Sequence, residues 1–343
     1  MATTTAQRPE TYVPEATPAV NWLRRGMAIT AIAIGVVFIA VTLIQNLFSV
    51  GPAFEELIDD FRPVLQDAAL AQADGDVAAL GAVGDEMQTA VIPGIAQALS
   101  MTPEDFGAFM GSEFPAVATG VAALPEIVPT FQGLIGTLGE QQALFFSADE
   151  IPTEDLPATT VPWGLLFAGI AVVAVGIVML RSSKLGAYLA IGLGLLLVVV
   201  PLVLTLPTKS SDADELNANL DPIYTPELVQ GAEGALGVVG AMGAEMQTAM
   251  LPALGQQLGM TGDELNAFMG ANFPATAGAL QELPATMERF EGLTTVFADN
   301  LDNYDTIKPV SFAPIIWMVI IGGGVLFVLG AWTAVDATRR RFI

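Results

Sequence analysis

Four long stretches without a charged side chain constrain this chain more than any other feature. Each is apolar and about as long as the ~20 residues that a helix needs to cross a ~30 Å hydrocarbon layer. Only 14% of the 343 residues are charged, whereas about a quarter are charged in ordinary soluble domains. The sequence therefore predicts an all-α membrane protein with four transmembrane helices. The expected spans cover residues 26–50, 161–180, 185–206 and 312–335.

The basic residues indicate how these spans are oriented. Eight of the 12 lie before the first span, between the second and third, or after the fourth. The positive-inside rule assigns that side to the cytoplasm, in a plasma membrane. We therefore expect a disordered cytoplasmic tail at 1–25, a cytoplasmic turn at 181–184 and a basic cytoplasmic tail at 336–343, with both termini inside. The large segments 51–160 and 207–311 are then extracytoplasmic.

The chain contains an internal repeat. Shifting the sequence by 159 positions aligns residues 81–134 with 240–293 without a gap, and 26 of the 54 positions are identical. The same shift aligns the first expected span with the third. The predicted unit is therefore span, external helical domain and span, repeated once in tandem. Both copies have the same orientation, which predicts an internal pseudo-dimer with a pseudo-two-fold axis along the membrane normal.

The external segments have helical periodicity. Apolar residues recur at helical spacing in 54–65 and 77–99, which predicts a bundle of roughly four helices in each copy. Thr102 and Thr261 are expected to be helix N-caps, each followed by acidic residues close to a capping-box pattern. We expect irregular connectors at 148–160 and 208–227.

Prolines in the external segments are expected to kink or interrupt helices. Those positions are Pro93, Pro125, Pro129, Pro252 and Pro284.

Composition excludes many kinds of chemistry. The chain has no cysteine and no histidine, so disulfides, thiol catalysis, serine–histidine triads and imidazole metal sites are ruled out. A net charge of −24 makes binding of nucleic acid very unfavourable. We expect no enzyme activity, no catalytic residues, no cofactor and no metal site.

Two weak metal signals have structural interpretations. Met242, Met246 and Met250 lie on one helical face and could bind Cu(I), but the first copy has valine at two of the matching positions, which favours a packed core. Residues 299–305 are rich in oxygen ligands but lack the spacing of a calcium loop, so we interpret them as a solvated acidic connector. Glu86 and its copy Glu245 are interpreted as structural groups, a cap or an inter-helix hydrogen bond.

An aromatic and methionine cluster, present in both copies, is the one candidate site. It forms either the core of each bundle or, where exposed, a groove for an acyl chain or a partner helix. Its members are Phe106, Phe109, Met110, Phe114, Leu265, Phe268, Met269 and Phe273.

These features favour a non-enzymatic accessory or scaffold protein of a bacterial plasma membrane. Its duplicated external domains would dock an envelope or membrane protein complex, with membrane lipids as the other partners. The alternative is a protein that binds a lipid or another hydrophobic ligand in an apolar groove of the external bundles. A channel or transporter is less consistent with spans that lack ionisable groups.

Overall fold

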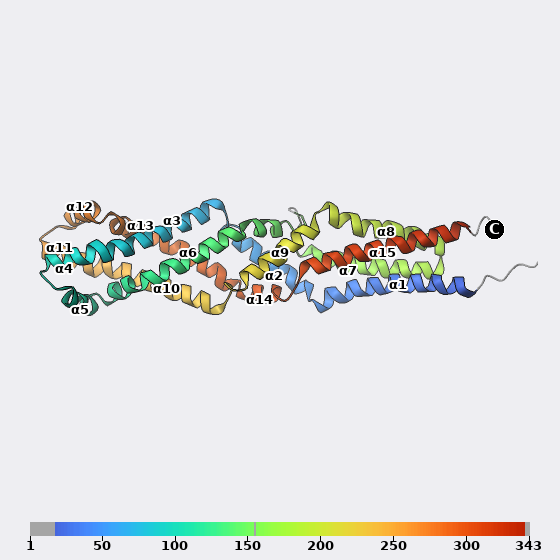
Figure 1. The fold of residues 1–343 in the computed structure, drawn as a ribbon, viewed down its shortest axis with the longest axis horizontal. Coiled ribbons are helices and arrows are strands. Elements are labelled where there is room, and N and C mark those ends of the chain that lie inside the picture. The colour runs from blue at the N-terminus through green and yellow to red at the C-terminus, as the bar shows by residue number, and fades with distance from the viewer. Residues whose placement is uncertain (1–17, 154–155, 340–343) are drawn as a thin grey trace, which may run out of the picture. The chain divides into compact units, whose positions relative to one another are not determined.

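The computed structural model describes residues 18–153 and 156–339, and within them the chain is helical apart from short turns and one isolated bridge between Thr153 and Leu156 (Figure 1). The all-α prediction is confirmed. Contacts divide the chain into two compact units. Unit 1 comprises 1–48, 160–207 and 313–343, and unit 2 comprises 49–159 and 208–312.

Unit 1 contains four long apolar helices. They are α1 (Pro18–Ile44), α7 (Thr160–Arg181), α8 (Ser183–Val203) and α15 (Phe312–Arg339). All four are long and apolar enough to cross a membrane, and so is a fifth helix, α6 (Pro115–Asp149). The sequence did not predict α6 as a span. Its buried residues pack within unit 2, against α3 and α10.

Glycines allow the unit 1 helices to approach closely in antiparallel pairs. A Cβ atom on Gly35 would lie 2.6 Å from the Gly169 carbonyl oxygen of α7, and one on Gly176 would lie 3.0 Å from the Ala28 carbonyl oxygen of α1. In the second pair, a Cβ on Gly194 of α8 would lie 2.7 Å from the Gly323 carbonyl oxygen of α15. Packing of small residues is the main attraction between helices where the hydrophobic effect is absent.

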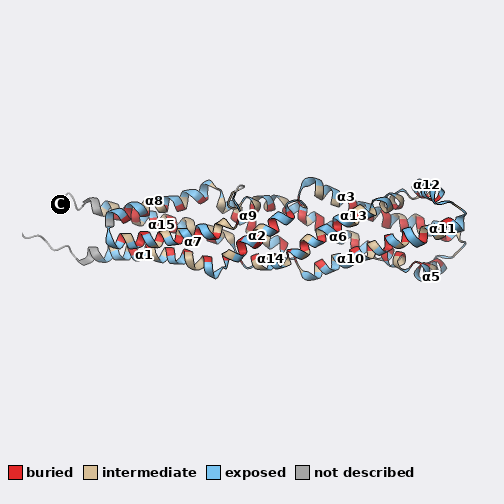
Figure 2. Cartoon of the chain, turned by 180° about the vertical axis from the view of Figure 1, so that it is seen from behind, coloured by how far each residue is buried: buried red, intermediate tan, exposed pale blue. Residues whose placement is uncertain are grey.

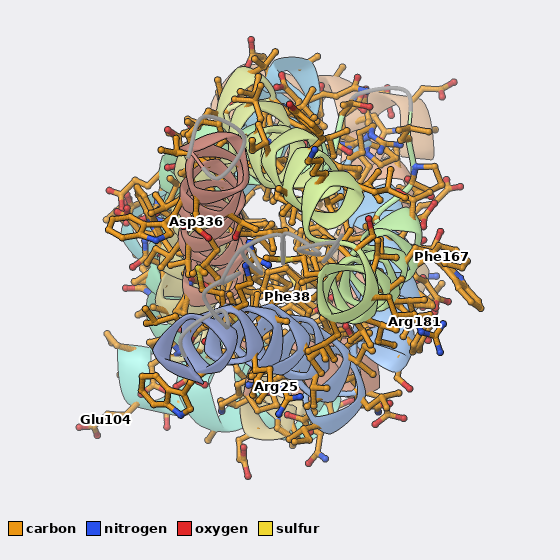
Figure 3. The ribbon with its side chains drawn as sticks, turned by 90° about the vertical axis from the view of Figure 1, so that its right-hand side faces the viewer. Arg25, Phe38, Glu104, Phe167, Arg181 and Asp336 are labelled. Atoms are coloured by element: carbon orange, nitrogen blue, oxygen red, sulfur yellow. The ribbon has the colours of Figure 1, made fainter. Side chains whose placement is uncertain are left out.

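Unit 1 exposes its apolar residues instead of covering them. Of the large apolar side chains that are exposed in the described residues, all but Phe146, Leu156 and Leu258 belong to unit 1. Figure 2 colours the exposed residues of these helices pale blue. Phe38 lies between the helices and is 1% exposed, whereas Phe167 projects outward and is 61% exposed (Figure 3). The outer surface of unit 1 is therefore rich in exposed apolar side chains.

In unit 2, the first copy of the repeat contributes five α-helices and one π-turn. They are α2 (Leu47–Phe61), α3 (Asp67–Glu86), the π-turn η1 (Met87–Val91), α4 (Ile92–Ala98), α5 (Pro103–Glu113) and α6.

The second copy has the same order with one extra short helix. Its elements are α9 (Leu206–Leu220), α10 (Pro226–Glu245), η2 (Met246–Met250), α11 (Leu251–Leu258), α12 (Gly262–Asn272), α13 (Pro274–Asp299) and α14 (Leu301–Ile307).

The centre of unit 2 is a bundle of α3, α6, α10 and α13. Each helix packs against one helix of its own copy and one of the other: α3 contacts α6 and α13, and α10 contacts α13 and α6. The main core cluster draws buried side chains from both copies. A second cluster joins α2, α9 and α14 to the C-terminal parts of α6 and α13. The helices α4, α5, α11 and α12 gather at one end of the unit (Figure 1).

Several local expectations are confirmed. The Thr102 side chain accepts a hydrogen bond from the backbone N–H of Asp105, and Thr261 forms a full capping box with Glu264. Backbone features recur at the repeat spacing of 159 residues. Asn46 and Thr205 both have positive φ, as do Ser100 and Gly259.

Other boundaries differ from the prediction. Helix α1 begins at Pro18, so part of the expected tail at 1–25 is helical, while 1–17 lies outside the described residues, as do the last four residues of the expected basic tail. The helix ends at Ile44 instead of residue 50, because the chain turns at Asn46. The expected connector at 208–227 is largely helix α9, whose polar sequence conceals four buried residues spaced every three or four positions.

The prolines act in two ways. Helices α6 and α13 continue through Pro125, Pro129 and Pro284, so the expected interruptions do not occur. Pro93 and Pro252 each lie two positions after the last residue of a π-turn. A proline lacks the N–H that a regular α-helix needs, and the wider π-turn before it accommodates the missing bond.

Candidate functional site

The predicted aromatic and methionine cluster is largely interior. Phe106, Met110 and Phe114 are at most 8% exposed and belong to the main core cluster. In the second copy Leu265 and Met269 are 5% exposed. These positions pack α5 and α12 against the ends of the central bundle.

Three members of the cluster are only partly buried. Phe109 and Phe268 lie at matching positions in α5 and α12, and Phe273 opens α13. Phe109 packs edge-on against Phe114 with ring centroids 5.9 Å apart, and Phe268 does the same with Phe273 at 6.0 Å. Both copies thus use an identical ring pair at this end of the unit.

The repeated glutamates cap helices of the opposite copy. The Glu86 carboxylate accepts the backbone N–H of Thr276 at 2.7 Å and of Ala275 at 3.4 Å, at the start of α13. The Glu245 carboxylate accepts the N–H of Val117 at 2.8 Å, at the start of α6. A carboxylate at a helix N-terminus satisfies orphan N–H groups and stabilises the helix dipole. The interpretation of these glutamates as caps is confirmed, and the caps join the two copies.

Every basic residue in unit 2 is paired inside the unit. Arg62, Lys209, Arg289 and Lys308 are the only ones that the sequence places there. Their shortest carboxylate partners are Asp149, Glu150, Asp76 and Asp221, respectively. The sequence gives 33 acidic residues in total to unit 2 against these four basic ones, so acidic residues greatly outnumber basic ones in the unit.

Two of these ion pairs occupy matching positions with their charges exchanged. Arg62 pairs with Asp149 at 2.7 Å in the first copy. The residues 159 positions later are Asp221 and Lys308, which pair with each other. Hydrogen bonding to Asp149 raises the pKa of Arg62, and bonding to Asp221 raises the pKa of Lys308. The divergence at Arg62 and Asp221 that the sequence displays is therefore a compensated reversal, not the loss of a contact.

A third ion pair has no counterpart. Arg289 of α13 donates two hydrogen bonds to the buried carboxylate of Asp76 in α3, at 2.7 and 2.8 Å. Gln72 also donates to Asp76, at 3.2 Å, and the hydrogen bonds from Arg289 raise the pKa of its guanidinium. The positions 159 residues away hold Ala235 and Thr130, which cannot form an ion pair.

This pair borders an apolar cavity of about 500 Å³ in unit 2. Helices α3 and α13 form its walls, and Ile135 and Leu138 of α6 also line it. A second hollow of about 340 Å³ lies beside Arg62 and Asp149 and is as polar as it is apolar. Sequence reasoning missed both the cavity and the Asp76–Arg289 pair, because their components lie more than 200 residues apart. The available signal was the scarcity of cations in this unit.

Aromatic residues pack around Phe297, the second-copy counterpart of the cavity residue Leu138. Tyr224 stacks on Tyr304 with centroids 4.6 Å apart, and Phe297 lies 5.2 Å from Tyr224. Burial raises the pKa of both tyrosines. The Tyr304 hydroxyl donates to the Asn217 carbonyl oxygen at 2.8 Å.

The weak metal signals find no geometric support in the described part of the chain. It contains no group of three or more acidic side chains placed to hold a metal ion. Met242, Met246 and Met250 are at most 3% exposed within the main core cluster. Residues 299–305 are mostly helical instead of forming the expected connector, since α14 begins at Leu301. Asn300 there is fully buried and donates to Asp60 at 2.8 Å.

Comparison with known proteins identifies no relative: no family model, no curated protein and no solved structure matches this chain.

Proposed function

We propose that α1, α7, α8 and α15 are the four membrane spans, arranged as two tandem span–domain–span repeats. The exposed apolar side chains of unit 1 support this assignment, because a soluble protein rarely exposes contiguous apolar patches larger than a few hundred Å². α6 satisfies the same length criterion, but its Glu126 and Glu140 and its packing inside unit 2 favour an external position. Both termini and the 181–184 turn are then cytoplasmic, and unit 2 is extracytoplasmic.

The tryptophans give independent support for this assignment. All four of the chain lie in unit 1 and are 48–74% exposed. Trp163 and Trp317 are near the starts of α7 and α15. Trp22 is near the start of α1, and Trp332 is near the end of α15. Tryptophan is enriched at both membrane interfaces, where its ring meets the lipid head groups. Trp317 and Trp332 are 15 residues apart, which corresponds to roughly 22 Å along a helix.

We further propose that the protein is a non-enzymatic accessory or scaffold protein of a bacterial plasma membrane. Unit 2 would dock a membrane or envelope protein with a basic surface. The observation that carries this proposal is that all four cations of unit 2 are neutralised internally, which leaves an acidic surface. Such a surface steers oppositely charged partners and gives salt-dependent binding. The glutamate caps and the shared core join the two copies within this unit.

Transport through unit 1 is the less favoured function. The apolar stretches of these helices, residues 26–50, 161–180, 185–206 and 312–335, contain no Asp, Glu, Lys or Arg. The buried hydroxyls of Thr42 and Thr333 donate to carbonyl oxygens of their own helices, at 2.9 and 2.7 Å. Polar groups that form a pathway normally face one another or a water-filled cavity.

Chemical cross-linking in intact cells, followed by purification, tests the scaffold proposal. We expect one protein partner in constant ratio to the chain, with an affinity that falls as salt is raised from 50 to 500 mM, conditions chosen because the Debye length shortens from roughly 14 to roughly 4 Å. Retention of the same partner without any salt dependence would contradict electrostatic docking. Absence of any partner at constant ratio would contradict the scaffold function.

Two sets of variants locate the docking face. One neutralises exposed carboxylates of the end helices, with Glu104→Gln, Glu113→Gln and Asp263→Asn; the Glu104 side chain projects away from the chain in Figure 3. The matched set removes the same charge from the bundle flanks, with Glu126→Gln, Glu140→Gln and Glu233→Gln. Weaker binding in one set identifies the face, and unchanged binding in both contradicts the proposal.

A further inference from the structure

The apolar cavity between α3 and α13 is a concave feature of unit 2 with an ion pair at its edge. Its volume of about 500 Å³ lies within the ~300–1,000 Å³ typical of small-molecule sites. Aliphatic side chains form most of the lining. They include Leu70, Ala73, Ile135, Leu138, Leu293 and Val296.

The two copies of the repeat differ at positions that line this cavity. Two lining positions, Ala69 and Leu138, correspond to Leu228 and Phe297 in the second copy. Phe297 is 6% exposed and packs edge-on against Phe61 with centroids 5.0 Å apart. At these two positions the second copy has the larger side chains, whereas at others, such as Ile135 and its counterpart Thr294, the matching residue is smaller.

The Asp76–Arg289 ion pair also has no counterpart at the matching positions of the repeat. Asp76 and Arg289 line the cavity, whereas Ala235 and Thr130 stand at the matching positions. The Arg289 side chain is 38% exposed, and an ion pair that solvent reaches contributes little net stability, because water screens the attraction between the charges. A pair that the second copy dispenses with, and that occurs only beside a cavity, is better explained by the cavity than by folding.

The rim offers both a donor and acceptors. The Arg289 guanidinium uses its Nε and Nη2 groups on Asp76 and Thr286, and no acceptor among the described residues bonds its Nη1 group. Carboxylates of Asp60 and Glu288 also line the cavity, so its formal charge is negative. An anionic head group would be repelled there, whereas a hydroxyl could both accept from Arg289 and donate to a carboxylate.

We propose that this cavity binds a single hydrocarbon chain that ends in an uncharged hydroxyl group. The aliphatic walls hold the chain, and the Asp76–Arg289 pair fixes the orientation of the head group. This site is distinct from the Phe109 and Phe268 positions, and it does not depend on the docking of a protein partner.

Photolabelling of the full chain in phospholipid nanodiscs tests the proposal. The probe is hexadecanol with a diazirine in its chain, and labelled peptides are located by mass spectrometry. Unit 1 peptides provide an internal reference, because they are labelled from the bilayer. We expect additional labelling in residues 60–76 and 288–296, and at least about tenfold less there with hexadecanoate at the same concentration, equivalent to a 1.4 kcal/mol weaker affinity.

Cavity-filling variants supply the decisive comparison. Ala69→Leu with Leu138→Phe introduces the residues of the second copy, which the fold already accepts in that environment. We expect this double variant to lose labelling of 60–76 and 288–296 by about tenfold. Ala78→Leu is the matched control for Ala69→Leu. Ala78 is exposed on the same helix α3, and the substitution adds the same atoms outside the cavity.

Each outcome decides one part of the proposal. Labelling confined to unit 1, or unchanged in the filled variant with a wild-type circular dichroism spectrum, would overturn the site. Equal labelling by hexadecanol and hexadecanoate would overturn the assigned head group. Replacing the pair together, with Asp76→Ala and Arg289→Thr, should weaken labelling by hexadecanol, because the groups that orient the hydroxyl are lost, while Asp60 and Glu288 still disfavour hexadecanoate. Unchanged labelling by hexadecanol in this variant would overturn the role assigned to the pair.

Discussion

Individual charged residues show how the two copies diverged while keeping the same contacts. Arg62 and Asp149 form an ion pair in the first copy. Asp221 and Lys308, at the matching positions of the second copy, form an ion pair with the charges reversed. Such a reversal requires two compensating changes in one copy. Because these side chains are 23–50% exposed, solvent screens both pairs and each contributes little to stability.

Charge exchange within the first copy tests this compensation. Arg62→Asp alone places a third carboxylate beside Asp59 and Asp149, and we expect a loss of about 1 kcal/mol in the free energy of unfolding. Adding Asp149→Lys recreates the second-copy arrangement and should recover most of the loss. Chemical unfolding followed by circular dichroism measures both. If the double variant loses more free energy of unfolding than the two single variants together, the positions are not equivalent.

The capping box at Thr261 predicts a dependence on pH. The backbone N–H of Thr261, followed by its hydroxyl, lowers the pKa of Glu264 below its ordinary value of 4.5. A lowered folded-state pKa stabilises the fold at pH values above 4.5, and this contribution disappears as the pH falls through the lowered value.

Glu264→Gln isolates this effect, because glutamine can occupy the same position in a capping box without titrating in this range. We expect the variant to unfold at a lower temperature than the wild type at pH 7. The difference should shrink toward zero as the pH falls below about 4. A difference that stays constant between pH 7 and pH 3 would contradict the assigned cause.

At the scale of helices, one glycine determines how closely the copies approach. A Cβ on Gly120 of α6 would lie 2.6 Å from both Cβ and Sδ of Met242 in α10, too close for the methionine to avoid by moving its tip. We expect Gly120→Ala to lower the free energy of unfolding by about 2 kcal/mol through overpacking.

Gly133 is the matched control on the same helix. A Cβ there meets nothing within 4 Å, and the residue is exposed. Gly133→Ala should be neutral or stabilise the protein by up to about 1 kcal/mol, because alanine has the higher helix propensity. Equal effects of the two substitutions on thermal unfolding would show that α6 and α10 are not in tight contact at Gly120.

Because each glutamate caps a helix of the other copy, removing it should destabilise that other copy. Glu86→Ala leaves N–H groups at the start of α13 without an acceptor, and we expect a loss of about 1 kcal/mol. Hydrogen exchange should accelerate at Ala275 and Thr276 of the second copy, although the substitution is in the first. Glu245→Ala should accelerate exchange at Val117 instead. Faster exchange only within the copy that carries the substitution would contradict the capping scheme.

Local signals in the sequence predict the helices better than their partners. Thr102 and Thr261 are recognisable as caps because the residues they bond lie three positions away. Helix α9 is harder to predict, since its sequence is polar on average and only its spacing of buried residues marks it. The partners of Glu86 and Asp76 lie 189 or more residues away, and no periodicity encodes such distances.

At the scale of the whole molecule, every functional proposal depends on which side of the membrane each segment occupies. The chain has no cysteine, so a single introduced cysteine reports on one position without any background. Suitable external positions are Glu104 and Asp263, which are exposed at matching sites of α5 and α12. Ser182 lies in the turn between α7 and α8, on the proposed cytoplasmic side.

We expect a membrane-impermeant maleimide to label Glu104→Cys and Asp263→Cys in intact cells whose outer layers admit the reagent. Ser182→Cys should react only after the plasma membrane is permeabilised. The positive-inside rule predicts this pattern because eight basic residues flank the proposed cytoplasmic ends of the spans. Labelling of Ser182→Cys in intact cells together with protection of the other two would reverse the orientation. Protection of only one of the two external positions would mean that the copies face opposite sides, and unit 2 could then not assemble from both.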